Sequence, residues 1–197
     1  AVSALKKCMR KDIARCLSKL SKDEIAHQTS FVLKTVEACK PLEAAHRVGI
    51  YISTDGEIIT DGIIDLLFRQ NKEIYIPNFK KGASDMQFVR LAQSEWIEGL
   101  PTTMWNIRQH SSFDDSQLLN TPLDLVFMPG VAFAAHSDGS FKRLGHGKGY
   151  FDRFLHNHSA TYGRMPYLIG LALKEQIVDE VPLEEHDVPL NHLFYEF

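Results

Sequence analysis

The densest group of residues that could do chemistry is the run RLGHGKGYFDR, at residues 143–153. Three glycines alternate within five residues of this run, directly before a predicted helix: Gly145, Gly147 and Gly149. Glycines allow positive φ angles and let backbone N–H groups approach a ligand closely, and the free N–H groups where a helix begins favour phosphate. Arg143 and Lys148 add positive charge, and Asp152 in the first helical turn could hold Mg²⁺. The run therefore predicts a phosphate-binding loop beside a metal site.

Two familiar phosphate-binding patterns do not match this run. A Walker loop needs GxxxxGK followed by Ser or Thr, whereas Lys148 is followed by Gly149. The dinucleotide fingerprint needs a strand directly before its glycines, and the preceding strand is predicted to end near Met128. A plain glycine-rich turn followed by a helix is the simpler alternative, with Asp152 as an ordinary acid of the first helical turn.

Charged residues elsewhere could join such a site. Lys6 and Arg10 are four residues apart in a predicted helix, so both lie on one face and could contact phosphates together. A solvated basic face is the alternative. Taken alone, Glu57 is an acid in a turn at residues 54–57, and Asp187 is an acid in a surface loop.

The hydrophobic pattern predicts two N-terminal helices followed by alternating strands and helices. Helical spacing predicts helices over residues 4–20, 21–38, 60–69 and 149–157, with Ser21 and Glu24 as a capping box and Pro41 ending the second helix. Short apolar runs predict strands over 48–53, 73–77, 86–91, 123–128 and 167–173, and an edge strand over 191–196. The irregular stretch 92–121 is expected to lie over the site as loops. This order predicts a single-domain α/β fold over residues 1–197, with three layers in which helices flank a mainly parallel central sheet.

Composition excludes several classes of protein. Of the 197 residues, 44% are hydrophobic and 24% are charged, which is ordinary for a globular protein and too apolar for a disordered one. No window approaches the ~18–20 unbroken apolar residues that a membrane span needs, and the basic N-terminus lacks the apolar core of a secretory signal. The three cysteines form no CxxC pair, which indicates reduced thiols. We therefore expect a soluble, cytoplasmic protein with no membrane partner.

The charge is unevenly distributed, although the net charge is only −3. The first 22 residues are rich in Lys and Arg, whereas the residues from 175 onward contain acids but no Lys or Arg. No RNP, zinc-finger or interleaved aromatic pattern accompanies the basic end, so no nucleic-acid partner is expected. No histidine pair has zinc-site spacing, and His156 and His158 are interpreted as surface residues. A small polyanion such as a nucleotide fits this pattern better.

RLGHGKGYFDR resembles the signature of the 5-formyltetrahydrofolate cyclo-ligase family, also called methenyltetrahydrofolate synthetases. The resemblance continues in order along nearly the whole chain. It includes KKCMR at residues 6–10, IYIS at 50–53 leading to Glu57, DLVFMPG at 124–130, ALKEQI at 172–177, VP at 181–182 and EHD at 185–187. Two departures stand out. The family usually has Trp-Asn-Ile followed shortly by Pro, whereas this chain has WNIRQH at residues 105–110, and Phe151 replaces a common Tyr.

The resemblance implies a set of roles for particular residues. For ATP it implies Lys6, Lys7, Cys8, Met9, Arg10, Arg143, Leu144, Gly145, His146, Gly147, Lys148, Gly149, Tyr150 and Phe151, with Lys148 and Arg143 also catalytic. For the folate it implies Ile52, Glu57, Trp105, His146, Gly147, Lys148, Gly149 and Tyr150. For Mg²⁺ it implies Asp152 and Asp187.

The resemblance also implies a reaction, in which 5-formyltetrahydrofolate, ATP and Mg²⁺ give 5,10-methenyltetrahydrofolate, ADP and phosphate. ATP would phosphorylate the formyl oxygen, and N10 would then attack the activated carbon as phosphate leaves. The protein would mainly position the groups and neutralise charge, and we expect a monomer. Two other classes suit the α/β pattern, namely a sugar-phosphate isomerase or CoA-transferase-like enzyme, and a folate-binding relative without activity. The basic N-terminal helix and the two acids favour ATP use.

Overall fold

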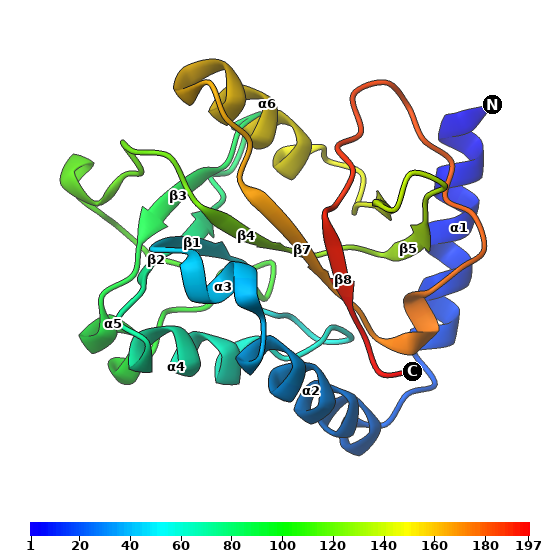
Figure 1. Cartoon of the computed structure of the whole chain (residues 1–197), viewed down its shortest axis with the longest axis horizontal. Coiled ribbons are helices and arrows are strands. Elements are labelled where there is room, and N and C mark those ends of the chain that lie inside the picture. Colours follow the sequence, from blue (N-terminus) through cyan, green and yellow to red (C-terminus); the bar gives the residue numbers. More distant parts are fainter.

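A six-stranded sheet forms the centre of the computed structural model, which describes all residues from 1 to 197 (Figure 1). Its strands lie in the order β3-β2-β1-β4-β7-β8. Their bounds are β1 Arg47–Ile50, β2 Glu73–Asn78, β3 Gln87–Arg90, β4 Leu125–Met128, β7 Tyr167–Leu171 and β8 His192–Phe194. Neighbouring strands pair in parallel except β2 and β3, which are antiparallel. The prediction of a mainly parallel central sheet is confirmed.

Helices cover both faces of this sheet. In Figure 1, α6 lies on one side of the sheet, and α2 and α4 lie on the other. The helices are α1 Val2–Leu17, α2 Lys22–Glu37, α3 Lys40–Ala44, α4 Asp61–Arg69, α5 Gln93–Glu98 and α6 Tyr150–Tyr162, with 3-10 turns η1 Asp115–Gln117 and η2 Lys174–Gln176. All four residues of β4 are buried, as the apolar run predicted for a strand covered on both faces. The three-layer prediction is confirmed.

Local signals explain where several helices begin and end. Ser21 Oγ accepts a hydrogen bond from Glu24 N at 3.1 Å, so the predicted cap starts α2. Pro41 was expected to end this helix, but α2 ends at Glu37 and Pro41 lies in the first turn of α3, where its missing N–H costs nothing. Helix α6 runs five residues beyond its predicted end, to Tyr162, and stops where Gly163 has a φ of 69°.

The sequence pattern missed α3, α5 and a two-stranded antiparallel hairpin, and α5 corrects the expectation that the whole stretch 92–121 forms loops. The hairpin consists of β5 Ala132–Ala135 and β6 Phe141–Leu144. Strand β6 leads directly into Gly145, so a strand does precede the glycine-rich run, contrary to the prediction. This strand lies outside the main parallel sheet, so the strand–helix–strand context of a dinucleotide site is still lacking.

The hairpin also explains where α1 lies. Ile13 of α1 packs with Ala132, Ala134 and Leu144 of the hairpin in a small second core. Figure 1 shows α1 beside β5. This packing brings one face of the basic N-terminal helix to the glycine-rich run, although the two are far apart in sequence.

Some smaller expectations are also resolved. His158 is buried, and its Nε2 accepts a hydrogen bond from Leu123 N at 2.9 Å, so its interpretation as a surface residue is wrong. His156 is exposed, as predicted. All three cysteines are free. None of the helices has the length and apolar character that crossing a bilayer requires.

Candidate functional site

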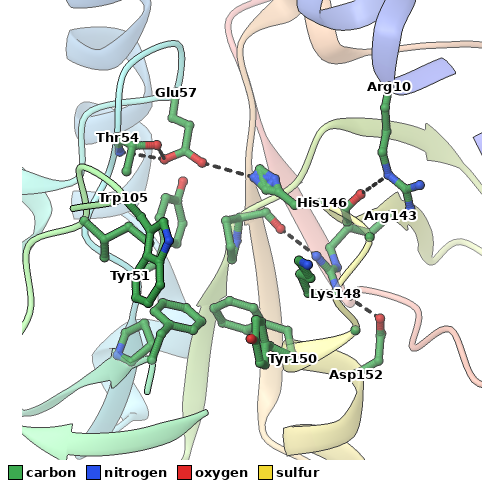
Figure 2. Close-up of a pocket in the computed structure, with 18 of the residues that line it drawn as sticks. Arg10, Tyr51, Thr54, Glu57, Trp105, Arg143, His146, Lys148, Tyr150 and Asp152 are labelled. Carbon is green, nitrogen blue, oxygen red and sulfur yellow. Dashed lines mark hydrogen bonds and ion pairs between the residues drawn. The ribbon is translucent and has the colours of Figure 1, made fainter. Parts of the chain in front are cut away.

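A large cleft of ≈860 Å³ opens at the carboxyl ends of the central strands. Tyr51 and Ile52, which follow β1, line it together with Pro129, which follows β4. From β1 the chain continues to β2 on one side, and from β4 to β7 on the other, so the strand order reverses at this point. Open parallel sheets bind ligands at such reversals. Figure 2 shows the two walls of the cleft facing each other.

The glycine-rich loop at residues 145–149 forms one wall. Gly147 and Gly149 have φ values of 105° and 69°, a region that favours glycine. A Cβ at Gly147 would lie 3.4 Å from Arg10 Cζ, and one at Gly149 would lie 2.8 Å from Arg153 Nη1. The positive φ angles therefore favour glycine at both positions, and at Gly149 a Cβ would also displace the Arg153 guanidinium.

Arg143 lies beneath this loop and is only 7% exposed. Its Nη1 donates to Pro129 O at 2.9 Å, and its Nη2 donates to Asp152 Oδ2 at 3.3 Å. Burial lowers the pKa of Arg143 from its ordinary value, and the charge of Asp152 opposes this effect. The buried Nε has no hydrogen-bond partner. A largely buried cation that lines the cleft suits an anionic ligand.

Helix α1 supplies two further cations to the same wall. Arg10 Nε donates to Gly145 O at 2.8 Å, so this side chain also holds the glycine-rich loop. Lys6 Nζ lies 2.8 Å from Glu184 Oε2 and 2.6 Å from Asp187 Oδ2. Both residues line the cleft, as expected for positions that share one helix face.

Four residues that the resemblance assigned to ATP have side chains outside the cleft lining. Lys7 and Cys8 are exposed on α1, and Met9 packs against the small second core. Leu144 is buried in that same core. The structure therefore does not bring these four side chains to the cleft.

Acidic groups gather below the glycine-rich loop. Asp152 and Asp187, the two predicted metal ligands, both line the cleft, and Asp152 Oδ1 accepts from Val188 N at 3.1 Å. Glu184 and His186 join Asp187, with one ligand atom of each within 4.8 Å of the others. Burial alone would raise the pKa of Asp187, but hydrogen bonds from Lys6 and from Glu184 N lower it overall.

Glu57 faces this loop from the opposite wall. Its Oε2 accepts from Thr54 N at 2.8 Å and from Thr54 Oγ1 at 3.3 Å, while its Oε1 lies 3.5 Å from His146 Nε2 (Figure 2). Burial raises the pKa of Glu57 to about 7, although the bonds from Thr54 lower it in part. Desolvation within the cleft lowers the pKa of His146, and the charges of Arg143 and Arg10 lower it further.

Aromatic and apolar side chains complete this opposite wall and the floor. Tyr150 lines the cleft and packs edge-on against Phe79, with ring centroids 5.2 Å apart. Trp105 lines it from a loop and is 48% exposed, and Ile52 is buried. Phe151 lines the cleft from the edge of the main core, where its ring lies 6.2 Å from that of Phe88. Flat ligands could stack here beside the carboxylate of Glu57.

Sequence reasoning missed several cleft residues: Ser3, Tyr51, Thr54, Asp55, Lys80, Lys81, Arg108, Glu184 and His186. Most carry no local signal, because their proximity depends on which strand ends meet. The acid-rich run at 184–187 was visible as a cluster and could have suggested Glu184. Part of the irregular stretch 92–121 does lie at the cleft, at residues 105–108, as predicted.

Together, the fold and the cleft define a class of α/β proteins in which a cation-lined glycine-rich loop, suited to phosphate, faces a wall suited to a flat ligand. Within that class, the chain belongs to the 5-formyltetrahydrofolate cyclo-ligase family, whose model matches residues 2–196. The family's enzymes are ligases, so the predicted enzyme class is confirmed, and the alternative of a sugar-phosphate isomerase or CoA-transferase-like enzyme is excluded.

Individual relatives agree with this assignment. A probable 5-formyltetrahydrofolate cyclo-ligase of Caenorhabditis elegans is 39% identical, and the alignment covers 100% of this chain and 95% of the relative. The 5-formyltetrahydrofolate cyclo-ligase of Mus musculus is 36% identical, over 99% and 95%. An NMR structure of 5,10-methenyltetrahydrofolate synthetase from Aquifex aeolicus matches 96% of this chain and 88% of its own, with a TM-score of 0.73 and 22% identity, which shows a shared fold.

Proposed function

We propose that this chain, as a single domain over residues 1–197, converts 5-formyltetrahydrofolate, with ATP, to 5,10-methenyltetrahydrofolate, ADP and phosphate. One observation carries the proposal beyond family membership. His146 of the glycine-rich loop lies 3.5 Å from Glu57 of the opposite wall, so the two subsites meet within one cleft. A phosphoryl group on the loop and a folate on the wall would therefore be adjacent.

The reaction needs such adjacency. The formyl oxygen of the substrate is a poor leaving group, so ATP first transfers its terminal phosphoryl group to that oxygen. N10 then forms a bond to the activated carbon and releases its proton, and the bond from that carbon to the phosphorylated oxygen breaks as phosphate leaves. Arg143 and Lys148 would neutralise the charge that spreads over the phosphoryl oxygens in transfer. The backbone of residues 145–149, with Lys6 and Arg10, would bind the rest of the triphosphate.

The donor set at the acidic end of the cleft fits Mg²⁺. Carboxylate oxygens are the ligands that this hard cation prefers, and Asp152 and Asp187 supply them at the end of the glycine-rich loop. When bound, the ion would shield the phosphate charges. Lys6 would then exchange its contact with Asp187 for a contact with phosphate.

The carboxylate of Glu57 would accept hydrogen bonds from the N–H groups of the pterin. Ile52 would give an apolar contact beside it, and Tyr150 and Trp105 would pack against the flat rings. His146, Gly147, Lys148 and Gly149 would lie between both substrates. A monomer in the cytoplasm with no nucleic-acid or membrane partner is part of the same proposal, supported by the free cysteines and the moderate net charge.

Near-ultraviolet absorbance of the methenyl product tests this function directly. Purified protein is mixed with 5-formyltetrahydrofolate, ATP and Mg²⁺, and matched reactions omit ATP or replace Mg²⁺ with a chelator. We expect product only in the complete mixture. Folate binding by calorimetry without any product would instead assign a folate-binding relative that lacks activity.

A further inference from the structure

Residues 101–109 form a short hairpin whose tip carries Trp105 into the cleft wall. Asn106 makes the turn with a φ of 60°. At the root of the hairpin, the side-chain amide of Gln109 exchanges two hydrogen bonds of 2.9 Å with the backbone of Phe79, just beyond the end of β2. This contact fixes the root to the sheet. A second contact is needed to fix the position of Trp105 at the tip.

Arg108 provides that second contact. Its Nη1 donates to Asp61 Oδ2 at 2.9 Å and its Nη2 donates to Asp61 Oδ1 at 2.7 Å, a two-point pairing. The guanidinium carbon also lies 5.7 Å from the ring centroid of Trp96, whose Nε1 donates to Asp65 Oδ1 at 2.8 Å. An exposed ion pair with a single hydrogen bond contributes little to stability. A guanidinium that makes two hydrogen bonds to one carboxylate and stacks on an aromatic ring is instead held in one orientation. The Arg108 and Asp61 side chains are only 32% and 39% exposed.

Asp61 is the first residue of α4, directly after the loop that carries Glu57. Ser53 and Thr60 close that loop by exchanging hydrogen bonds: Ser53 N donates to Thr60 Oγ1 at 2.9 Å, and Thr60 N donates to Ser53 Oγ at 3.1 Å. The pair between Arg108 and Asp61 therefore joins two separate segments of one wall. One segment carries Trp105 and the other carries Glu57.

We propose that Arg108 is a positioning residue for the folate, because its pairing with Asp61 sets Trp105 at a fixed place relative to Glu57. The proposal rests on the proposed function, in which both of those residues contact the folate. Asp61 takes one donor from each Nη of Arg108 and fixes the guanidinium in place, so Arg108 acts through the hairpin, and the double variants below separate this role from direct contact with the folate.

Calorimetric titration of 5-formyltetrahydrofolate tests the proposal without relying on turnover. The variants are Arg108→Ala, Arg108→Lys and Asp61→Asn, each also made in a Trp105→Ala background. Arg90→Ala is the control, because it removes an arginine that is ion-paired to Glu73 outside the cleft.

We expect Arg108→Ala and Asp61→Asn to weaken folate binding roughly fivefold, the scale of a well-oriented ion pair. Arg108→Lys should weaken binding too, because an ammonium cannot pair with both oxygens at once. ATP binding and the control should stay within twofold of wild type.

The double variants distinguish positioning from direct contact. If Arg108 acts through Trp105, Arg108→Ala adds nothing once Trp105 is Ala. A further fivefold loss in that background would mean that Arg108 touches the folate itself, and the proposal would be wrong. Unchanged folate binding in Arg108→Ala, or a parallel loss of ATP affinity and melting temperature, would also overturn it. If wild type formed no methenyl product, the proposed activity would fail, while these binding results would still decide the role of Arg108.

Discussion

Lys6 Nζ lies 2.6 Å from Asp187 Oδ2, so a cation predicted for ATP and an acid predicted for Mg²⁺ neutralise each other across the cleft wall. Glu184 Oε2 lies 2.8 Å from the same ammonium group. Lys6 and Asp187 are largely buried, with side chains 9% and 10% exposed. Such a pair is costly to break from one side, because the remaining acid is left without a partner.

The first prediction follows from this pairing. Lys6→Met should lower the free energy of unfolding of the ligand-free protein by about 2 kcal/mol. Millimolar Mg²⁺ should restore more stability to the variant than to wild type, because the released carboxylates can then bind the cation. Urea unfolding with and without Mg²⁺ measures both effects.

Lys142→Met is the matched control, since Lys142 pairs with exposed Glu180 outside the cleft. Its stability should change by less than ~1 kcal/mol, with no special response to Mg²⁺. An equal Mg²⁺ effect on wild type and Lys6→Met would mean that the acids freed by the substitution do not bind the ion.

The raised pKa of Glu57 predicts how stability depends on pH. In the unfolded chain this carboxyl ionises near its ordinary pKa of 4.5, whereas burial raises its pKa to about 7 in the folded protein. Between these values the folded state binds more protons than the unfolded state, so the contribution of Glu57 to stability falls as pH rises from 4.5 to 7. Glu57→Gln removes the free-energy penalty of ionising this buried carboxyl. The free energy of unfolding of the variant should exceed that of wild type by about 2 kcal/mol at pH 8, and by little at pH 4.5.

Urea unfolding of both proteins at each pH measures the difference. The lowered pKa of His146 acts in the opposite direction, because stability then rises as pH passes through the ordinary pKa of 6.5. Comparing variant with wild type at the same pH therefore reports Glu57 together with its interaction with His146, whose Nε2 lies 3.5 Å away. A constant difference between the two proteins across this range would show that Glu57 is ionised at all these pH values.

The same substitution should separate the two substrates. Glu57→Gln keeps the shape but loses a charged acceptor, so folate affinity should fall by roughly 1.5–3 kcal/mol. ATP affinity, measured without folate, should stay near the wild-type value. Equal weakening of both ligands would mean that Glu57 supports the wall through Thr54 and does not contact the pterin.

The parts of the structure that these variants probe differ in how well they can be predicted from the sequence. The parallel strands were predictable because each is a compact apolar run, and α2 because Ser21 caps it locally. Strand β5 was not, because Ala132–Ala135 is built mostly of small residues that carry little β-propensity, and its partner β6 mixes apolar with charged residues. The glycine-rich loop was predictable since its parts are contiguous. The pairing of Lys6 with Asp187 and of Arg108 with Asp61 was not, because each joins segments that only the fold brings together.

Lys148 is exposed on the glycine-rich loop and lines the cleft, which leads to a clear kinetic prediction. Lys148→Ala should reduce turnover on the order of 10²-fold or more, since a positioned charge is most valuable while the phosphoryl group is between two oxygens. The melting temperature should hardly change, because an exposed loop lysine adds little to the core. Steady-state absorbance assays and a thermal melt measure both. Wild-type turnover by folded Lys148→Ala protein would remove Lys148 from the catalytic residues.

Arg10→Ala tests whether α1 binds ATP or only covers the cleft. Arg10 Nε donates to Gly145 O, so the guanidinium both faces the phosphate subsite and holds the loop that forms it. The apparent Michaelis constant for ATP should therefore rise, while the constant for folate changes little. The free energy of unfolding without ligand should fall by about 1 kcal/mol, because the substitution removes the hydrogen bond to Gly145 O. Lys7→Ala is the matched control, because Lys7 is exposed on the same helix and does not line the cleft. It removes the same charge and should leave ATP binding unaltered.

At matched ATP concentrations below saturation, ATP should protect wild type and Lys7→Ala against unfolding to the same extent, and should protect Arg10→Ala less. Equal protection of all three proteins would show that α1 is only a structural cover, with the triphosphate held by the glycine-rich loop, Arg143 and Lys148.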